Sequence, residues 1–205
     1  MVAPWKWECR AMHGLINRAI QCFVTDSYGA DKWVEATRLA DLDFVEFEAM
    51  LIYDDDITPR LLDAISNILD RPRSDVMEDM GTYLVSHPNV EALRRLLRFG
   101  GVTFVEFLHS LDDLPDRARL AVSDLNLPKI ELRDHSPTHF SLVCESPIDG
   151  YGHVMMGILR TMADDYGALA LLEHTGSGQG VETISVTLIE TEFAEGRVFD
   201  LGARA

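Results

Sequence analysis

Apolar residues recur every three or four positions through the first part of the chain. From Met12 this spacing predicts a helix over about 12–28, and Gly29 is expected to be its C-cap because glycine adopts the left-handed conformations found there. Polar residues that favour helix N-termini precede further apolar series of the same period. Five more helices are therefore expected to begin at Asp31, Thr58, Ser74, Asn89 and Thr103.

After Pro128 the period falls from three or four residues to two, which is typical of β-strands with one buried face. Ile130 and Leu132 alternate with polar residues, and Phe140, Leu142 and Cys144 repeat the pattern after a turn at 135–137. These two segments predict a β-hairpin.

A helical pattern returns after Asp149 and Gly150 and ends at Gly167. Two strand-like segments follow, at 168–174 and 181–190, and the glycine-rich sequence TGSGQG separates them as a flexible hairpin connection. The order of helices, hairpin, helix and hairpin predicts an α+β fold. We expect a helical N-terminal lobe, followed by an antiparallel sheet of about four strands with a covering helix.

A length of 205 residues suits a single domain. We assign the domain to residues 12–192, with residues 1–11 as an N-terminal extension and residues 193–205 as a C-terminal tail.

The charge and the apolar runs exclude several classes of partner. A formal net charge of -16 repels the phosphate backbone and argues against nucleic-acid binding. The first eleven residues lack the apolar core of a signal peptide, and no apolar run approaches the roughly 20 residues that cross a bilayer. Cys9, Cys22 and Cys144 form no even or closely spaced set and are expected to be reduced thiols. The sequence therefore predicts a cytoplasmic protein that does not bind membranes.

Other candidate motifs have simpler explanations. The run Asp54 to Asp56 lacks the spacing of a calcium loop and is expected to be a solvated turn, as are Asp112, Asp113 and Asp116. The sequence TGSGQG lacks the lysine and the following helix of a phosphate-binding loop. No metal site is predicted from these residues.

Five stretches, in this order and spacing, resemble the H-NOX family, the haem nitric oxide and oxygen binding domains of bacteria and of soluble guanylate cyclase. The stretches are MHGLINRAIQCFVTDSYGADKW from Met12, LIYDDD from Leu51, FVEFLHSLDDL from Phe104, LPKIEL from Leu127 and MGILRTMADDYG from Met156.

The resemblance implies a haem held between the helical lobe and the lobe of helix and sheet. In the family a histidine shortly after the LDDL-like run binds the iron, and a Tyr-x-Ser-x-Arg motif binds the propionates. Here Pro115 stands at the first position, and the motif reads Cys144-Glu145-Ser146-Pro147-Ile148, so that only Ser146 matches. The resemblance thus implies haem as cofactor, and these substitutions predict degenerate haem ligation.

The family-equivalent pocket, or a collapsed apolar core in its place, is expected to be lined by ten residues from several segments. They are Ile16, Ile20, Leu111, Pro115, Ala118, Cys144, Ser146, Ile148, Val154 and Ile158.

A substitute iron ligand would have to come from another histidine. His153 is the best candidate, because it opens the helix that covers the distal side of the haem in the family. His109 lies six positions before Pro115 and is expected to point away from its face. His139 is out of phase with the buried strand positions. The remaining histidines, expected at the surface or in turns, are His13, His87, His135 and His174.

The resemblance implies a sensory or regulatory domain without catalytic activity. Since no output domain is fused, we expect it to act in trans on a signalling protein such as a histidine kinase or a diguanylate cyclase. Its ligand would be another small apolar molecule, or none. One alternative is a genuine haem-binding gas sensor that uses His153. A second alternative is a small enzyme that uses Cys144 and His153.

Overall fold

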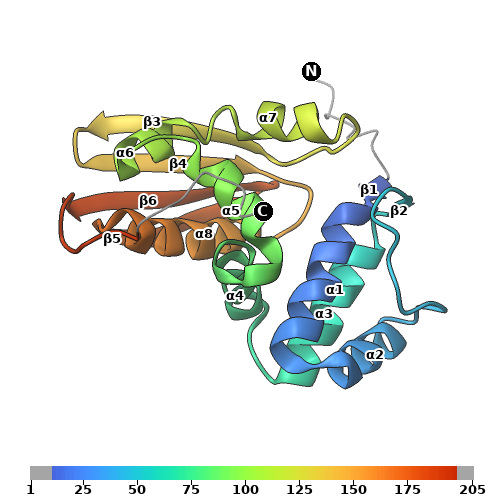
Figure 1. Ribbon diagram of the computed structural model, residues 1–205. Coiled ribbons are helices and arrows are strands. Elements are labelled where there is room, and N and C mark those ends of the chain that lie inside the picture. Colours follow the sequence, from blue (N-terminus) through green and yellow to red (C-terminus); the bar gives the residue numbers. More distant parts are fainter. Residues whose placement is uncertain (1–10, 198–205) are drawn as a thin grey trace, which may run out of the picture. The chain divides into compact units, whose positions relative to one another are not determined.

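The computed structural model describes residues 11–197 and divides into two compact units, with the boundary between Arg73 and Ser74 (Figure 1). The predicted extension and tail lie mostly outside the described residues. The first unit consists of three helices and a two-stranded sheet. These elements are β1 (Ala11–His13), α1 (Gly14–Tyr28), α2 (Ala30–Leu39), β2 (Ile52–Asp54) and α3 (Ile57–Leu69).

Helices α1 and α3 lie side by side in the first unit (Figure 1). The hydroxyl of Thr58 donates a hydrogen bond of 2.7 Å to Oδ1 of Asn17, and both side chains are buried. Thr58 was expected to cap α3, but the helix begins at Ile57 and Asp56 is the N-cap, two residues earlier than expected. Thr58 is therefore used in packing between two helices.

The beginning of α1 also differs from the prediction. Met12 does not start the helix but lies in β1, where it pairs with Tyr53 of β2. His13 is the N-cap and is buried, not at the surface, and its Nδ1 accepts a hydrogen bond of 3.1 Å from the backbone N–H of Leu15. The chain before β2 crosses this point closely, because a Cβ at Gly14 would overlap the carbonyl oxygen of Glu48. The pairing of β1 with β2 joins segments that are distant in sequence, so the local spacing of apolar residues does not predict it.

The second unit combines helices with one sheet, which confirms the predicted α+β class. Its elements are α4 (Arg73–Ser86), the 3₁₀ turn η1 (Pro88–Val90), α5 (Glu91–Arg98), α6 (Phe104–His109), α7 (Leu114–Ala121), β3 (Lys129–Ser136), β4 (His139–Glu145), α8 (Tyr151–Tyr166), β5 (Leu169–Gly178) and β6 (Val181–Glu190).

The four strands form an antiparallel sheet in the order β3-β4-β6-β5. Thr103 caps α6 as predicted, with a capping box to Glu106. Asn89 was expected to cap a helix but lies inside η1, and the side chain of His87 caps that turn instead.

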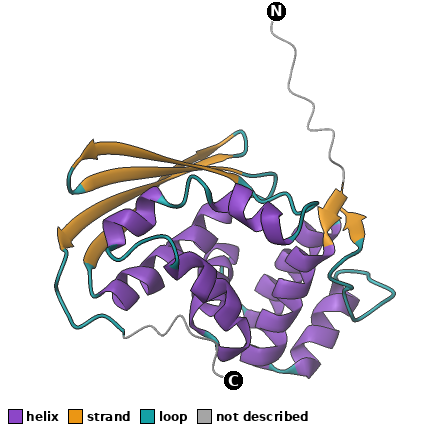
Figure 2. Ribbon diagram, turned by 45° about the horizontal axis from the view of Figure 1, so that its top comes forward, coloured by secondary structure: helices purple, strands orange, loops and turns teal. Residues whose placement is uncertain are grey.

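Alternate residues of the sheet form the core of the second unit, as their period predicts. The helices of this unit gather on one face of the sheet (Figure 2), and α8 packs against β5 and β6. The buried apolar positions on that face are Ile130, Phe140, Leu142, Cys144, Ile184, Val186 and Leu188.

The sequence TGSGQG is more ordered than predicted. Strand β5 continues through Gly178, and only Gln179 and Gly180 form the turn into β6. Both have positive φ, 54° and 76°, which is the backbone geometry that matches the twist of a two-residue hairpin. The expected flexible loop is thus a tight turn that fixes the register of β5 and β6.

Candidate functional site

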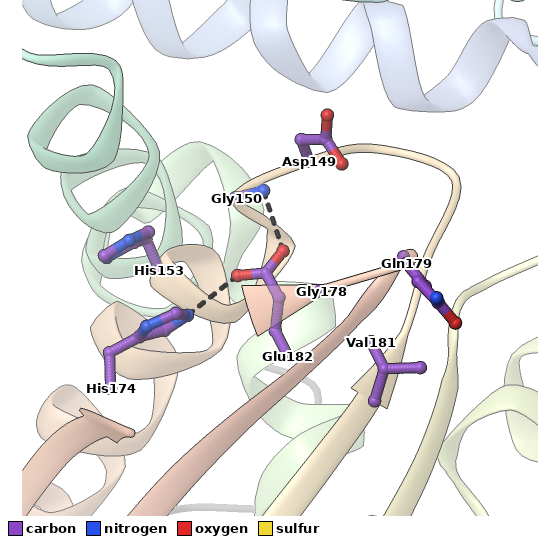
Figure 3. A pocket seen from close by; sticks show the side chains of 9 residues that line it. Asp149, Gly150, His153, His174, Gly178, Gln179, Val181 and Glu182 are labelled. Carbon is purple, nitrogen blue, oxygen red and sulfur yellow. Dashed lines mark hydrogen bonds and ion pairs between the residues drawn. The ribbon is translucent and has the colours of Figure 1, made fainter. Parts of the chain in front are cut away.

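A cavity of about 370 Å³ lies at the start of α8, where the chain arriving from β4 passes the turn between β5 and β6 (Figure 3). All of its lining residues belong to the second unit. They are Asp149, Gly150, His153, His174, Gly178, Gln179, Gly180, Val181 and Glu182.

Glu182 is the central side chain of this cavity, and only 7 % of it is exposed. Its Oε1 accepts a hydrogen bond of 2.7 Å from the backbone N–H of Gly150, and its Oε2 accepts one of 3.1 Å from Gly152. Oε2 also lies 2.9 Å from Nε2 of His174, which must be the donor because a carboxylate only accepts. These donors include the first N–H groups of α8, which favour a negative charge. Both oxygens of the buried Glu182 carboxylate therefore accept hydrogen bonds from the protein.

His153 stacks on His174, with ring centroids 4.6 Å apart and planes at 10°. Burial and the neighbouring His174 lower the pKa of His153, against the opposing effects of Glu182, Glu78 and Asp75. The imidazole of His153 is therefore held towards its neutral form. In that form one ring nitrogen keeps a lone pair.

Cys144 lies directly opposite Glu182 in the register of β4 and β6 and has no exposed surface. Burial and then the charge of Glu182 raise the pKa of its thiol to about 12. Burial likewise raises the pKa of Tyr151, the first residue of α8. Since the thiolate is the nucleophile and the metal ligand, Cys144 in this state is an inert packing residue. This observation gives no support to an enzyme built on Cys144.

Pro115 is buried in the first turn of α7, a position that tolerates proline because its N–H would have no helical partner. Leu111 and Ala118 are buried in the same part of the chain. Further along, the hydroxyl oxygen of Ser146 accepts a hydrogen bond of 3.0 Å from the N–H of Ile148, and the N–H of Ser146 donates to Gly180.

The other predicted pocket residues are also mostly buried. Ile20, Ile148, Val154 and Ile158 are each less than 9 % exposed, whereas Ile16 is half-buried. Ile16 and Ile20 belong to the first unit and the other eight residues to the second. That all ten surround one pocket remains a prediction.

The residues that the family resemblance assigns to the haem contacts do not fit a haem. Pro115 has no lone pair for iron, Ile148 has no group to bind a propionate, and Cys144 is a neutral thiol. In addition, the residue paired with Cys144 across the strands is Glu182, whose side chain is buried.

Two residues of the cavity were missed by the reasoning from sequence. His174 was assigned to the surface but lines the cavity and is only 20 % exposed, and Glu182 was not singled out. A usable signal was present, since Glu182 shares the two-residue phase of Ile184 and Val186, both fully buried. An acidic residue in the buried phase of a strand needs partners and therefore marks a site.

Most of the remaining candidates agree with their expected solvent exposure, and His87, expected at the surface or in a turn, is half-buried at the N-cap of η1. His109, His135 and His139 are exposed. Asp112 is exposed and accepts a hydrogen bond from the N–H of Leu132. Among residues 11–197 no group of three or more His, Cys, Asp or Glu side chains is arranged to hold a metal ion. In the same range no helix is both long and apolar enough to cross a membrane.

The chain is similar to proteins of known class. The chain is 24% identical over 154 residues to soluble guanylate cyclase gcy-31 of Caenorhabditis elegans, which covers 75% of this chain and 22% of that protein. It is 21% identical over 168 residues to soluble guanylate cyclase 89Da of Drosophila melanogaster, with 82% and 25% covered. The chain thus spans about a quarter of the length of these curated relatives.

Solved structures share the fold at low sequence identity. The Fe(II) unliganded H-NOX protein from K. algicida superposes with a TM-score of 0.73 at 16% identity, covering 87% of this chain and 97% of that one. The H-NOX protein from S. oneidensis in the Fe(II)NO state gives 0.71 at 17% identity, with 86% and 99% covered. The model of the haem-NO-binding family matches residues 13–174, well over half of the chain. The chain therefore belongs to the haem-NO-binding, or H-NOX, family of gas-sensing domains.

Proposed function

We propose that this chain is a regulatory H-NOX domain that has lost the haem contacts of its family and whose ligand-dependent state is read by a signalling protein. The observation that carries the proposal is the buried Pro115 in the first turn of α7, which the family resemblance aligns with the iron-binding histidine. The axial imidazole is the bond that tethers iron in such a site, and proline offers no substitute.

The propionate positions support the same conclusion. An arginine contact to a carboxylate contributes roughly 1.5–3 kcal/mol and a tyrosine hydroxyl about 1 kcal/mol. Ile148 and Cys144 supply neither. Their absence corresponds to a loss of roughly 10²-fold to 10³-fold in affinity, before the missing iron ligand is counted.

Absorption spectroscopy tests this proposal directly. Protein purified from cells supplied with haem should show little or no Soret band. The variant Pro115→His/Cys144→Tyr/Ile148→Arg should acquire one, because it restores the family's contacts at the matching positions. The matched control is Cys144→Tyr/Ile148→Arg, which keeps Pro115 and should remain colourless. Stoichiometric haem in the unmodified protein would refute the proposal.

The proposed ligand is a small apolar molecule, since Leu111, Ala118, Val154 and Ile158 present buried apolar side chains. The proposed partner is a histidine kinase or a diguanylate cyclase, the classes that the family resemblance implies. Affinity capture from the native host, with mass spectrometry, should recover such a protein. Measurable turnover of a small substrate by the isolated protein, without a captured signalling partner, would contradict this part of the proposal.

A second candidate function is haem sensing through His153. It is favoured by the lowered pKa of His153, which keeps a nitrogen lone pair available. In that case the unmodified protein should bind haem, and His153→Ala should abolish the Soret band. An unchanged spectrum in His153→Ala would exclude His153 as the ligand.

A further inference from the structure

Glu182 places a carboxylate inside the second unit, at the point where the chain leaves β4 and enters α8 (Figure 3). It reaches this point from β6, because its side chain lies on the same buried face of the sheet as that of its cross-strand partner Cys144. The carboxylate is thus next to the first of the three positions that correspond to the family's propionate-binding motif.

The segment that follows Cys144 closes around this carboxylate. The N–H of Ser146 donates to the carbonyl of Gly180, two residues before Glu182. The N–H groups of Gly150 and Gly152 then donate to the two carboxylate oxygens. Glycine at position 152 leaves room for this approach, since a Cβ there would lie 2.7 Å from Oε2 of Glu182 and the carboxylate would have to shift.

Donors in this part of the cavity are therefore already committed to an anion. The two backbone groups at the start of α8 and Nε2 of His174 all point at Glu182. Among the described residues that line the cavity there is no lysine or arginine, whereas a second carboxylate, that of Asp149, is present. An incoming carboxylate would be repelled by Glu182 and would meet no lysine or arginine among the described lining residues, which is costly in a partly buried site.

We infer that Glu182 is a specificity-determining residue, whose carboxylate takes the place of an anionic ligand group and makes this cavity reject carboxylates such as the propionates of haem. The inference rests on the proposed function, in that it gives a second and separate reason for weak haem binding. It also defines the ligand class that the cavity accepts, which is neutral or cationic. Restoring the missing haem contacts should therefore give a haem complex whose affinity Glu182 still lowers.

The test compares protoporphyrin IX with its dimethyl ester, which carries the same ring without the two negative charges. Binding is followed by tryptophan quenching and porphyrin absorption in the Pro115→His/Cys144→Tyr/Ile148→Arg background, with Glu182 intact. The ester should bind at least about tenfold more tightly than the diacid. Glu182→Gln, which keeps an acceptor for Gly150, should reduce this preference to less than about threefold. Glu190→Gln, an exposed glutamate of the same strand, should leave it unchanged.

Equal binding of the ester and the diacid with Glu182 intact would overturn the inference, and this comparison needs no variant of Glu182 that might fail to fold. A preference that persists in Glu182→Gln, or that Glu190→Gln also removes, would overturn it too. The same holds if no variant binds either porphyrin, because Glu182 is then not the barrier. Stoichiometric haem in the unmodified protein refutes the proposed function separately, and an ester preference there would still support the role of Glu182.

Discussion

The Glu182 carboxylate is almost shielded from water and depends on donors from three other residues. A buried carboxylate that loses one such donor bears a desolvation cost that solvent does not repay. This dependence couples strand β6, helix α8 and His174 of β5 through a single side chain. At the residue scale the side chains of the cavity are therefore coupled, and the charge of Glu182 is one of the influences on the pKa of His153.

The pH dependence of stability should report on His153. In the unfolded chain its pKa is near 6.5, whereas burial and His174 lower the pKa in the folded protein. Between these two values the unfolded chain binds more protons, so the free energy of unfolding should fall as the pH drops below about 6.5 and should be unaffected above about 7.5. Urea unfolding of the wild type and His153→Gln at several pH values measures this effect.

The expected result is a smaller loss of stability at acid pH in His153→Gln than in the wild type. His135→Gln is the matched control, because His135 is exposed. An identical pH profile for the wild type and His153→Gln would show that His153 does not titrate differently on folding.

At the scale of elements, helices α4 and α8 cross with almost no space between their backbones. A Cβ added at Gly81 of α4 would overlap the carbonyl oxygen of Val154, and one added at Gly157 of α8 would overlap that of Glu78. The two glycines thus make reciprocal contacts between the same pair of helices. Because α8 also carries the cavity residues at its start, this crossing holds the site against the rest of the second unit.

Gly81→Ala should destabilise the protein by roughly 1–3 kcal/mol, because the overlap is with backbone that has to shift. This cost exceeds the gain of up to about 1 kcal/mol from the better helix propensity of alanine. Chemical denaturation gives the value. Gly176→Ala is the control, since a Cβ there meets no atom within 4 Å and should change stability by less than about 0.5 kcal/mol. If Gly81→Ala did not change the free energy of unfolding, the backbones of α4 and α8 would have to lie further apart than they do in this structure.

On the scale of the whole molecule, the net charge of -16 dominates the interactions of the chain with other macromolecules. Acidic side chains outnumber basic ones by 34 to 18, so a negative field surrounds the protein. This field opposes association with polyanions and favours partners that present basic surfaces. It adds to the negative charge already buried at Glu182.

The protein should not retard duplex DNA in a gel-shift assay at about 0.15 M salt, because nucleic-acid affinity arises largely from counterion release by basic residues. A histone or another basic protein of similar size serves as the positive control. A shift that weakens as salt is added would reveal a basic surface that the net charge conceals.

Much of the fold could be predicted from the sequence because periodicity depends on local geometry. The two-residue phase of Phe140, Leu142 and Cys144 and the helical phase after Asp149 record which side of each element is buried, and the structure confirms both. The absence of an iron ligand at Pro115 also follows from the chemistry of one residue. The family resemblance supplied the meaning of that position.

Only the tertiary structure decided which side chains meet. Glu182 faces Cys144 because of the register between β4 and β6, and His174 reaches Glu182 because the turn at Gln179 and Gly180 sets the register of β5. The register of β4 and β6 results from pairing between segments distant in sequence, and in either pair a shift by one residue would turn every side chain to the other face. The sequence by itself therefore determined most of the elements, their buried faces and the proline at the position where the resemblance implies an axial histidine, whereas the long-range pairing of β4 with β6 placed a carboxylate beside Cys144.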